Sequence, residues 1–88
     1  MKEKAEDLKF PREWEFRLFV ESGALDAVRA ALQTLDAEED VGFSVADGEG
    51  SSGGKYRTIR VGCIVPSMER ARALAGRMGR IPGVRFMV

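Results

Sequence analysis

A stretch rich in glycine and serine divides this chain between two segments in which apolar residues alternate with others. The stretch, residues 48–54, offers no apolar side chain to a protein core. Residues 41–46 alternate before it, and residues 55–65 alternate after it. Alternation with period two is typical of β-strands, and a glycine-rich link between two strands is typical of an exposed, mobile hairpin loop. The sequence therefore predicts that residues 41–46 and 55–65 are antiparallel neighbours.

A strand followed by a helix is predicted before this hairpin. Residues 13–21 place aromatic and aliphatic side chains on one face and mostly charged ones on the other, as in a half-buried strand. Ser22 is a plausible N-cap for the helix that follows, whose apolar residues recur at helical spacing from Leu25 to Leu35. Acidic residues crowd positions 36–40 and oppose the helix dipole, so the helix is predicted to end near Leu35.

A helix followed by a strand is predicted after the hairpin. Pro66 ends the long strand, and Ser67 is placed to cap a second helix. The apolar stripe of that helix ends at Met78, and Pro82 with Gly83 makes a turn into a closing strand over residues 84–88. The element order is therefore β-α-β-β-α-β.

Short connections and right-handed crossovers fold this order into one architecture. The prediction is an α+β, ferredoxin-like two-layer sandwich with an antiparallel sheet in the order 4-1-3-2 and both helices on one face. Eighty-eight residues allow one core, so residues 1–10 are expected to be a flexible lead and residues 11–88 a single domain. The other sheet face stays open, and its predicted residues are Glu15, Arg17, Phe19, Thr58, Arg60, Ile64, Arg85 and Met87.

Charge is distributed unevenly along the chain, although the total is zero. Residues 1–54 hold thirteen acidic and six basic residues, whereas residues 55–88 hold eight basic residues and one acidic residue. Such asymmetry can indicate an anionic partner for the basic half. The predicted fold interleaves strands from both halves, so we expect the halves to neutralise each other.

The sequence favours a cytoplasmic protein with no membrane association. Residues 1–11 lack the apolar run of a signal peptide, and no stretch reaches the ~20 apolar residues of a membrane span. The single cysteine, Cys63, cannot form an internal disulfide, which favours a reducing compartment.

Residue types that carry catalysis or hold metals are scarce. The sequence contains no histidine and no asparagine, so it has no Ser-His or Cys-His pair. A lone thiol and scattered carboxylates predict neither a metal site nor a cofactor, and Cys63 is expected to be buried and inert. Gly48, Gly50 and Gly53 have dinucleotide-binding spacing, but a strand follows them where phosphate binding needs a helix. We therefore expect a protein that is not an enzyme.

The open sheet face is the first of two candidate binding sites. Its predicted interaction residues are Arg17, Phe19, Tyr56, Arg57, Thr58, Arg60 and Ile64. Apolar side chains on an exposed face favour a protein partner, and a homodimer is one form of such an interaction. The alternative is RNA, because RNA-recognition modules of this topology stack bases on aromatic residues of the central strands. The glycine-aromatic signature of those modules is absent from residues 55–62, which makes nucleic acid the less favoured partner.

The second candidate site is the corner between the first strand and the first helix. Its residues are Ser22, Gly23, Ala24 and Leu25. A glycine there allows close backbone approach, and a helix N-terminus offers N–H groups to an anion. The corner resembles that of ACT regulatory domains, which hold amino acids there in paired assemblies, and this resemblance implies a small ligand. The alternative is that Gly23 only turns the chain.

Three segments resemble the YbeD-like family of small bacterial proteins, a domain of unknown function numbered 493. They are Lys9-Phe10-Pro11, the turn from Ser51 to Tyr56, and the ending from Ile81 to Arg85. The resemblance covers roughly residues 9–88 and implies a ferredoxin-like fold related to ACT domains, without established catalysis. Members are sometimes described as lipoate regulators. The turn of this chain is longer and richer in glycine than that of its relatives.

Overall fold

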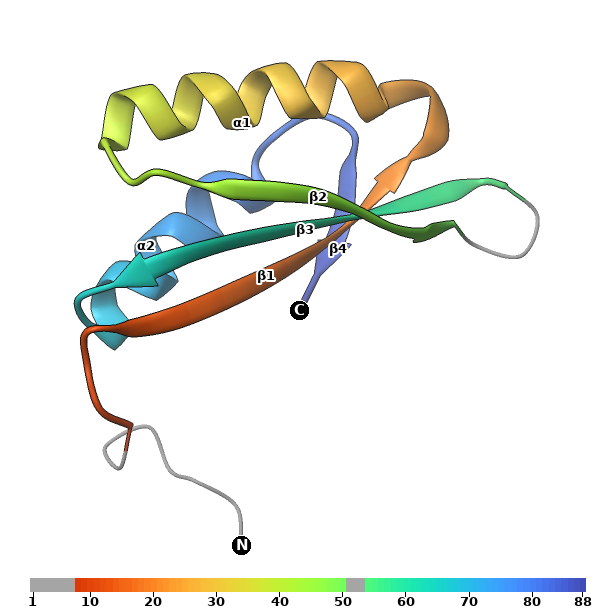
Figure 1. Ribbon diagram of the computed structural model, residues 1–88. Coiled ribbons are helices and arrows are strands. Elements are labelled where there is room, and N and C mark those ends of the chain that lie inside the picture. The colour runs from red at the N-terminus through yellow and green to blue at the C-terminus, as the bar shows by residue number, and fades with distance from the viewer. Residues whose placement is uncertain (1–7, 51–53) are drawn as a thin grey trace, which may run out of the picture.

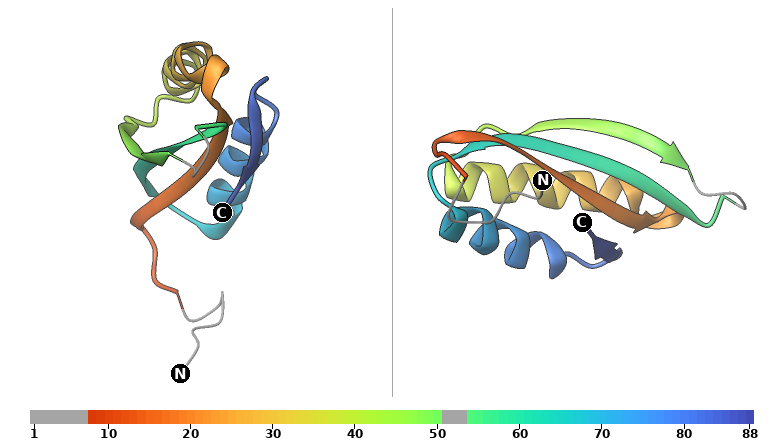
Figure 2. Two further views of the ribbon diagram at one scale, coloured as in Figure 1. Left: turned by 90° about the vertical axis from the view of Figure 1, so that its right-hand side faces the viewer. Right: turned by 90° about the horizontal axis from the view of Figure 1, so that it is seen from below.

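The structure, a computed structural model, describes residues 8–50 and 54–88. Four antiparallel strands form one sheet in the order β2-β3-β1-β4, and both helices cover the same face of it (Figures 1 and 2). The elements in chain order are β1 (Arg12–Glu21), the 3-10 turn η2 (Ser22–Ala24), α1 (Leu25–Glu39), β2 (Ser44–Gly50), β3 (Tyr56–Val65), α2 (Met68–Gly79) and β4 (Val84–Met87). The predicted fold is confirmed, because this strand order is 4-1-3-2 counted from the other edge.

The predicted flexible regions fall largely on residues 1–7 and 51–53, which lie outside the described residues. Phe10, predicted as part of the lead, packs against the core and stacks on Trp14 with ring centroids 6.2 Å apart.

A single apolar core fills the space between the sheet and the helices. Alternate residues of β1 and β3 point into it, and every third or fourth residue of the helices meets them. The buried residues are Phe16, Leu18, Val20, Val28, Leu32, Leu35, Ile59, Val61, Cys63, Val65, Ala71, Leu74 and Met78. The predicted core positions of β1, β3 and both helices are thus confirmed, and none of the described helices and strands covers the opposite face of the sheet (Figure 2).

The first helix is longer than predicted and ends at Glu39 rather than near Leu35. Three of the acidic residues at its end have partners: Asp36, Glu38, which pairs with Arg77 at 2.6 Å, and Glu39. Asp36 accepts hydrogen bonds from the backbone N–H groups of Gly42 (2.6 Å) and Phe43 (3.0 Å). Arg70 and Arg77 of α2 hold the Glu39 carboxylate at 2.5 and 2.9 Å. These partners offset the unfavourable helix dipole, so the helix continues.

The same contacts explain why β2 begins later than predicted. The N–H groups of Gly42 and Phe43 bind the Asp36 carboxylate, and Gly42 takes a φ of +85°. Both residues therefore belong to the loop that follows α1, and regular pairing with β3 starts only at Ser44, opposite Gly62. The strand then continues to Gly50, inside the segment predicted to be loop.

One predicted helix cap is confirmed and the other is wrong. The Ser67 hydroxyl accepts a hydrogen bond from the Arg70 N–H at 3.1 Å, which caps α2. Ser22 caps no helix, because α1 begins after a 3-10 turn and has no side-chain cap. The Ser22 hydroxyl instead donates to the carbonyl of Gly54 and its N–H to the carbonyl of Lys55, which ties the start of the helix to β3.

The closing strand presents different residues to the open face from those predicted. Val84 lies opposite Val20 on the core side. The neighbouring pair is Phe19 with Phe86, so the register of β4 shifts by one residue between these two pairs. Such a shift reverses the faces of the residues beyond it. Met87, predicted on the open face, therefore lies opposite Leu18 and packs against the core, while Phe86 takes its place outside.

Candidate functional site

The pairing of β1 with β3 determines which side chains are neighbours on the open face of the sheet. From β1 to β3 the pairs on this face are Glu13 with Ile64, Glu15 with Gly62, Arg17 with Arg60, Phe19 with Thr58, and Glu21 with Tyr56. Residues directly opposite on antiparallel strands point to the same side of a sheet. Acidic, basic and aromatic residues thus follow one another along a single strand, β1.

A stacked aromatic pair forms the apolar part of this face. The rings of Phe19 and Phe86 lie 4.6 Å apart at an interplanar angle of 20°, and 57% of Phe86 remains exposed. Val88 exchanges backbone hydrogen bonds of 2.9 Å with Arg17, which places it on the same face, and it is 75% exposed. The side chains of Phe19, Phe86 and Val88 form an aromatic patch that remains largely exposed to solvent in the folded chain.

Two arginines lie beside the aromatic pair in an arrangement that does not favour folding. Arg17 and Arg60 are directly opposite each other, and like charges in that position destabilise a sheet. The Glu15 carboxylate lies 3.8 Å from Arg17, and both side chains are more than half exposed. Arg60 has no ion-pair partner among the described residues. The face therefore keeps exposed positive charge that another molecule can use.

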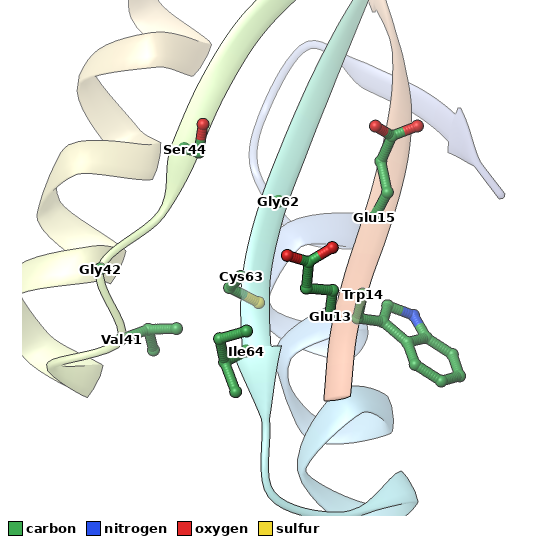
Figure 3. A pocket seen from close by; sticks show the side chains of 9 residues that line it. All are labelled: Glu13, Trp14, Glu15, Val41, Gly42, Ser44, Gly62, Cys63 and Ile64. Carbon is green, nitrogen blue, oxygen red and sulfur yellow. The ribbon is translucent and has the colours of Figure 1, made fainter. Parts of the chain in front are cut away.

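An open hollow of about 540 Å³ lies at the other end of the face. Its floor includes Gly62, which has no side chain, and the pairing of β2 with β3 starts here, with Ser44 opposite Gly62, so β2 does not extend beside Cys63 and Ile64. The carboxylates of Glu13 and Glu15 stand on β1 at one rim, and Ile64 stands on β3, whereas the Trp14 ring points away (Figure 3). Ile64 is 57% exposed. The hollow therefore suits a group that is cationic at its tip and apolar along its stem.

Most of the residues predicted for the open face lie together there. Arg17, Phe19, Tyr56, Thr58, Arg60 and Ile64 share the face by register. Arg57 does not belong to the group, because it lies opposite Val20 on the helix side of the sheet. Sequence reasoning missed Phe86 and Val88, whose alternation with Val84 indicated the core face. These two residues lie on the open face only because the register of β4 shifts by one residue, and no pattern in the sequence indicated that shift.

The predicted ligand corner is occupied by contacts within the chain. Ser22 uses its N–H and its hydroxyl on Lys55 and Gly54, and Gly83 packs directly against Ala24. A Cβ on Gly83 would lie 2.5 Å from the Ala24 Cβ, whereas one on Gly23 would meet no atom within 4 Å. The close backbone approach predicted for Gly23 is thus made by Gly83. Ligand binding by residues 22–25 stays a prediction.

The described residues provide few groups with unusual reactivity. Burial raises the pKa of the Cys63 thiol, which keeps it in the unreactive, protonated form near neutral pH. In residues 8–50 and 54–88 no cluster of three or more acidic or cysteine side chains is placed to hold a metal ion. Neither of the two described helices has the length and apolar character required to cross a membrane.

Comparison with known proteins gives a family and a shared fold. The model of the family described as "Protein of unknown function (DUF493)" matches residues 5–88. The solution structure of HP0495 from Helicobacter pylori superposes with a TM-score of 0.73 at 14% identity, covering 92% of this chain and 85% of that one. A second solution structure of HP0495 gives a TM-score of 0.68 at 14% identity, with 90% and 87% covered.

A protein with a different description shares the fold as well. The C-terminal domain of the MgtC protein from Mycobacterium tuberculosis superposes with a TM-score of 0.70 at 13% identity, covering 100% of this chain and 89% of that domain. No curated protein matches the chain.

Proposed function

This chain belongs to the DUF493 family, whose function is unknown, and we propose that it is a non-enzymatic regulatory domain that binds a protein partner through the open face of its sheet. The observation that carries the proposal is the Phe19–Phe86 pair, which is stacked and therefore ordered, yet half in water. Ordered aromatic side chains supply contact area at little entropic cost. The residue types support the absence of catalysis, since the chain has no histidine and its one thiol has a raised pKa.

The surroundings of the aromatic pair suit a protein surface. Aromatic residues and arginine are enriched at protein interfaces, where an apolar centre is rimmed by polar groups. Here Phe19, Phe86 and Val88 would form that centre, with Arg17 and Arg60 beside it. Carboxylates complete the rim, so a partner needs charges of both signs.

The mixed charge is also the reason for preferring protein to RNA. Glu13, Glu15 and Glu21 share the face with Arg17 and Arg60. Carboxylates repel the phosphates of a nucleic acid, whose affinity for proteins depends mainly on basic contacts. RNA binding predicts an affinity that weakens steeply with salt, and a gel-shift assay with single-stranded RNA at low salt tests it.

Affinity capture with matched variants tests the proposal. Phe86→Asp places a charge in the aromatic patch, while Arg72→Glu changes charge at an exposed position of α2, away from the open face. A partner that binds through the open face is captured by the wild type and by Arg72→Glu but lost with Phe86→Asp. Capture retained by Phe86→Asp would show that the partner uses another surface.

A further inference from the structure

We propose that the protein partner of the open face is a second copy of this chain, packed face to face so that the two β1 strands cross antiparallel about a two-fold axis. The inference rests on the proposed function, because it names the occupant of the same face. Two features carry it: the order of charges along β1, and the hollow at one end of the face.

The charges along β1 are complementary to their own reversed order. Going along the strand, the open face presents Glu13, Glu15, Arg17 and Phe19 in turn. Successive residues on one face of a strand are about 6.6–6.8 Å apart. A two-fold axis that passes between Glu15 and Arg17 reverses this order in the second copy. Glu15 of each copy then lies over Arg17 of the other, and the contact occurs twice, as in an isologous interface.

The same rotation brings Arg60 of each copy, which has no ion-pair partner within residues 8–50 and 54–88, to the hollow of the other. Arg60 lies beside Arg17 on β3, and Gly62 lies beside Glu15. When Glu15 faces Arg17 of the second copy, Gly62 faces Arg60 of the second copy. The long Arg60 side chain enters the hollow of about 540 Å³ with its guanidinium between the carboxylates of Glu13 and Glu15. The neighbouring arginines of one copy, Arg17 and Arg60, thereby lie close to the carboxylates of Glu13 and Glu15 of the other copy.

The apolar residues of β1 and β3 on this face are covered in the same arrangement. Phe19 lies at one end of the face and Ile64 at the other, so reversal brings Phe19 of each copy over Glu13 of its mate, beside the Ile64 of that mate, while Phe86 on β4 lies at the rim of the contact. Two dimensions of the molecule, 38 and 34 Å, leave room for the roughly 800 Å² per partner of a standard interface. The formal net charge of zero imposes no long-range repulsion between copies.

A charge-swap experiment tests both the dimer and its register. Arg17→Glu puts carboxylates at positions 13, 15 and 17 of β1, and Glu15→Arg reverses the charge of the other member of the Glu15–Arg17 contact; both positions are exposed. Sedimentation equilibrium gives the dimer dissociation constant of each full-length variant. Each single variant turns two attractive contacts into two repulsive ones, so the constant should rise about tenfold or more. Arg72→Glu, a reversal on α2, should leave it unchanged.

Mixing the two single variants restores complementarity in one specific pair of molecules. Glu15 of the Arg17→Glu chain then faces Arg17 of the Glu15→Arg chain, and the two substituted residues face each other as an ion pair. A heterodimer that forms on mixing, from variants that are each monomeric alone, supports the proposed register. The proposal is overturned if the wild type remains monomeric at about 1 mM. It is also overturned if the wild type forms a dimer whose dissociation constant is unchanged by both Arg17→Glu and Glu15→Arg. Either result leaves the Phe86→Asp capture experiment to decide separately whether the face binds a different protein.

Discussion

Phe86 of β4 lies directly opposite Phe19 of β1, and their rings stack 4.6 Å apart on the face of the sheet that no helix covers. The pairing depends on the one-residue register shift in β4, without which Phe86 would point toward the core. The shift exposes a large aromatic side chain, and Met87 packs against the core in its place. The fold thus positions an aromatic pair where it can contact another molecule.

The stack should make a modest contribution to stability. A double-mutant cycle with Phe19→Ala, Phe86→Ala and the double variant should give a coupling free energy of about 0.5–1.5 kcal/mol, the range for aromatic pairs. Urea unfolding of the four proteins measures it, at a concentration low enough for each to be monomeric. A coupling indistinguishable from zero would mean that the two rings do not interact in the monomer.

Two glycines that lie near the start of α1 should respond very differently to substitution by alanine. Gly83→Ala forces a side chain into a φ of +100° and a Cβ within 2.5 Å of the Ala24 Cβ, so it should lower the free energy of unfolding by about 3 kcal/mol. Gly23→Ala meets no atom within 4 Å and should change it by about 0.5 kcal/mol or less, or raise it slightly. Equal losses from both substitutions in thermal or urea unfolding would contradict the packing of this corner.

The contact between the two helix ends should make stability depend on pH. A hydrogen bond from Arg70, with the charges of Arg70 and Arg77, holds the pKa of Glu39 below its usual range. The folded state therefore binds fewer protons at Glu39 than the unfolded state does. The resulting stability is present above the ordinary glutamate pKa of about 4.3 and is lost as pH falls through the lowered value.

Glu39→Gln tests this contribution. The variant should unfold at lower urea concentration than the wild type at pH 7, and the difference should shrink as the pH is lowered below about 4. Glu69→Gln, at an exposed position of α2 away from the open face, is the control and should track the wild type throughout. A difference between Glu39→Gln and the wild type that stays constant down to pH 2 would show that the charge of Glu39 contributes nothing.

The parts of the fold that could be predicted from the sequence are those determined by residues close to one another in the chain. Alternation in β1 and β3 and the helical spacing of Val28, Leu32 and Leu35 marked the core positions, because burial repeats with the period of the element. The short connections then left one topology. Ser67 could be identified as a cap because a helix N-terminus has a local signature.

The predictions that were wrong depended on residues distant in the chain. The end of α1 was misplaced because the partners of Glu39 lie on α2, some thirty residues away or more. Ser22 was taken for a cap because its partner Gly54, just before β3, lies 32 residues away in the chain. The face of Phe86 was misassigned because a register shift is a property of two paired strands. These same distant contacts determine which residues meet at the candidate site.

If copies of this chain bind one another through the open sheet face, the residues of that face change their surroundings when the protein is diluted. Amide chemical shifts of the ¹⁵N-labelled protein, followed from about 1 mM to about 20 μM, measure this change residue by residue. We expect shift changes centred on Arg17, Phe19, Arg60 and Phe86, with none at Arg72 of α2. Changes confined to the outer surfaces of the helices, or no concentration dependence at all, would contradict binding through this face.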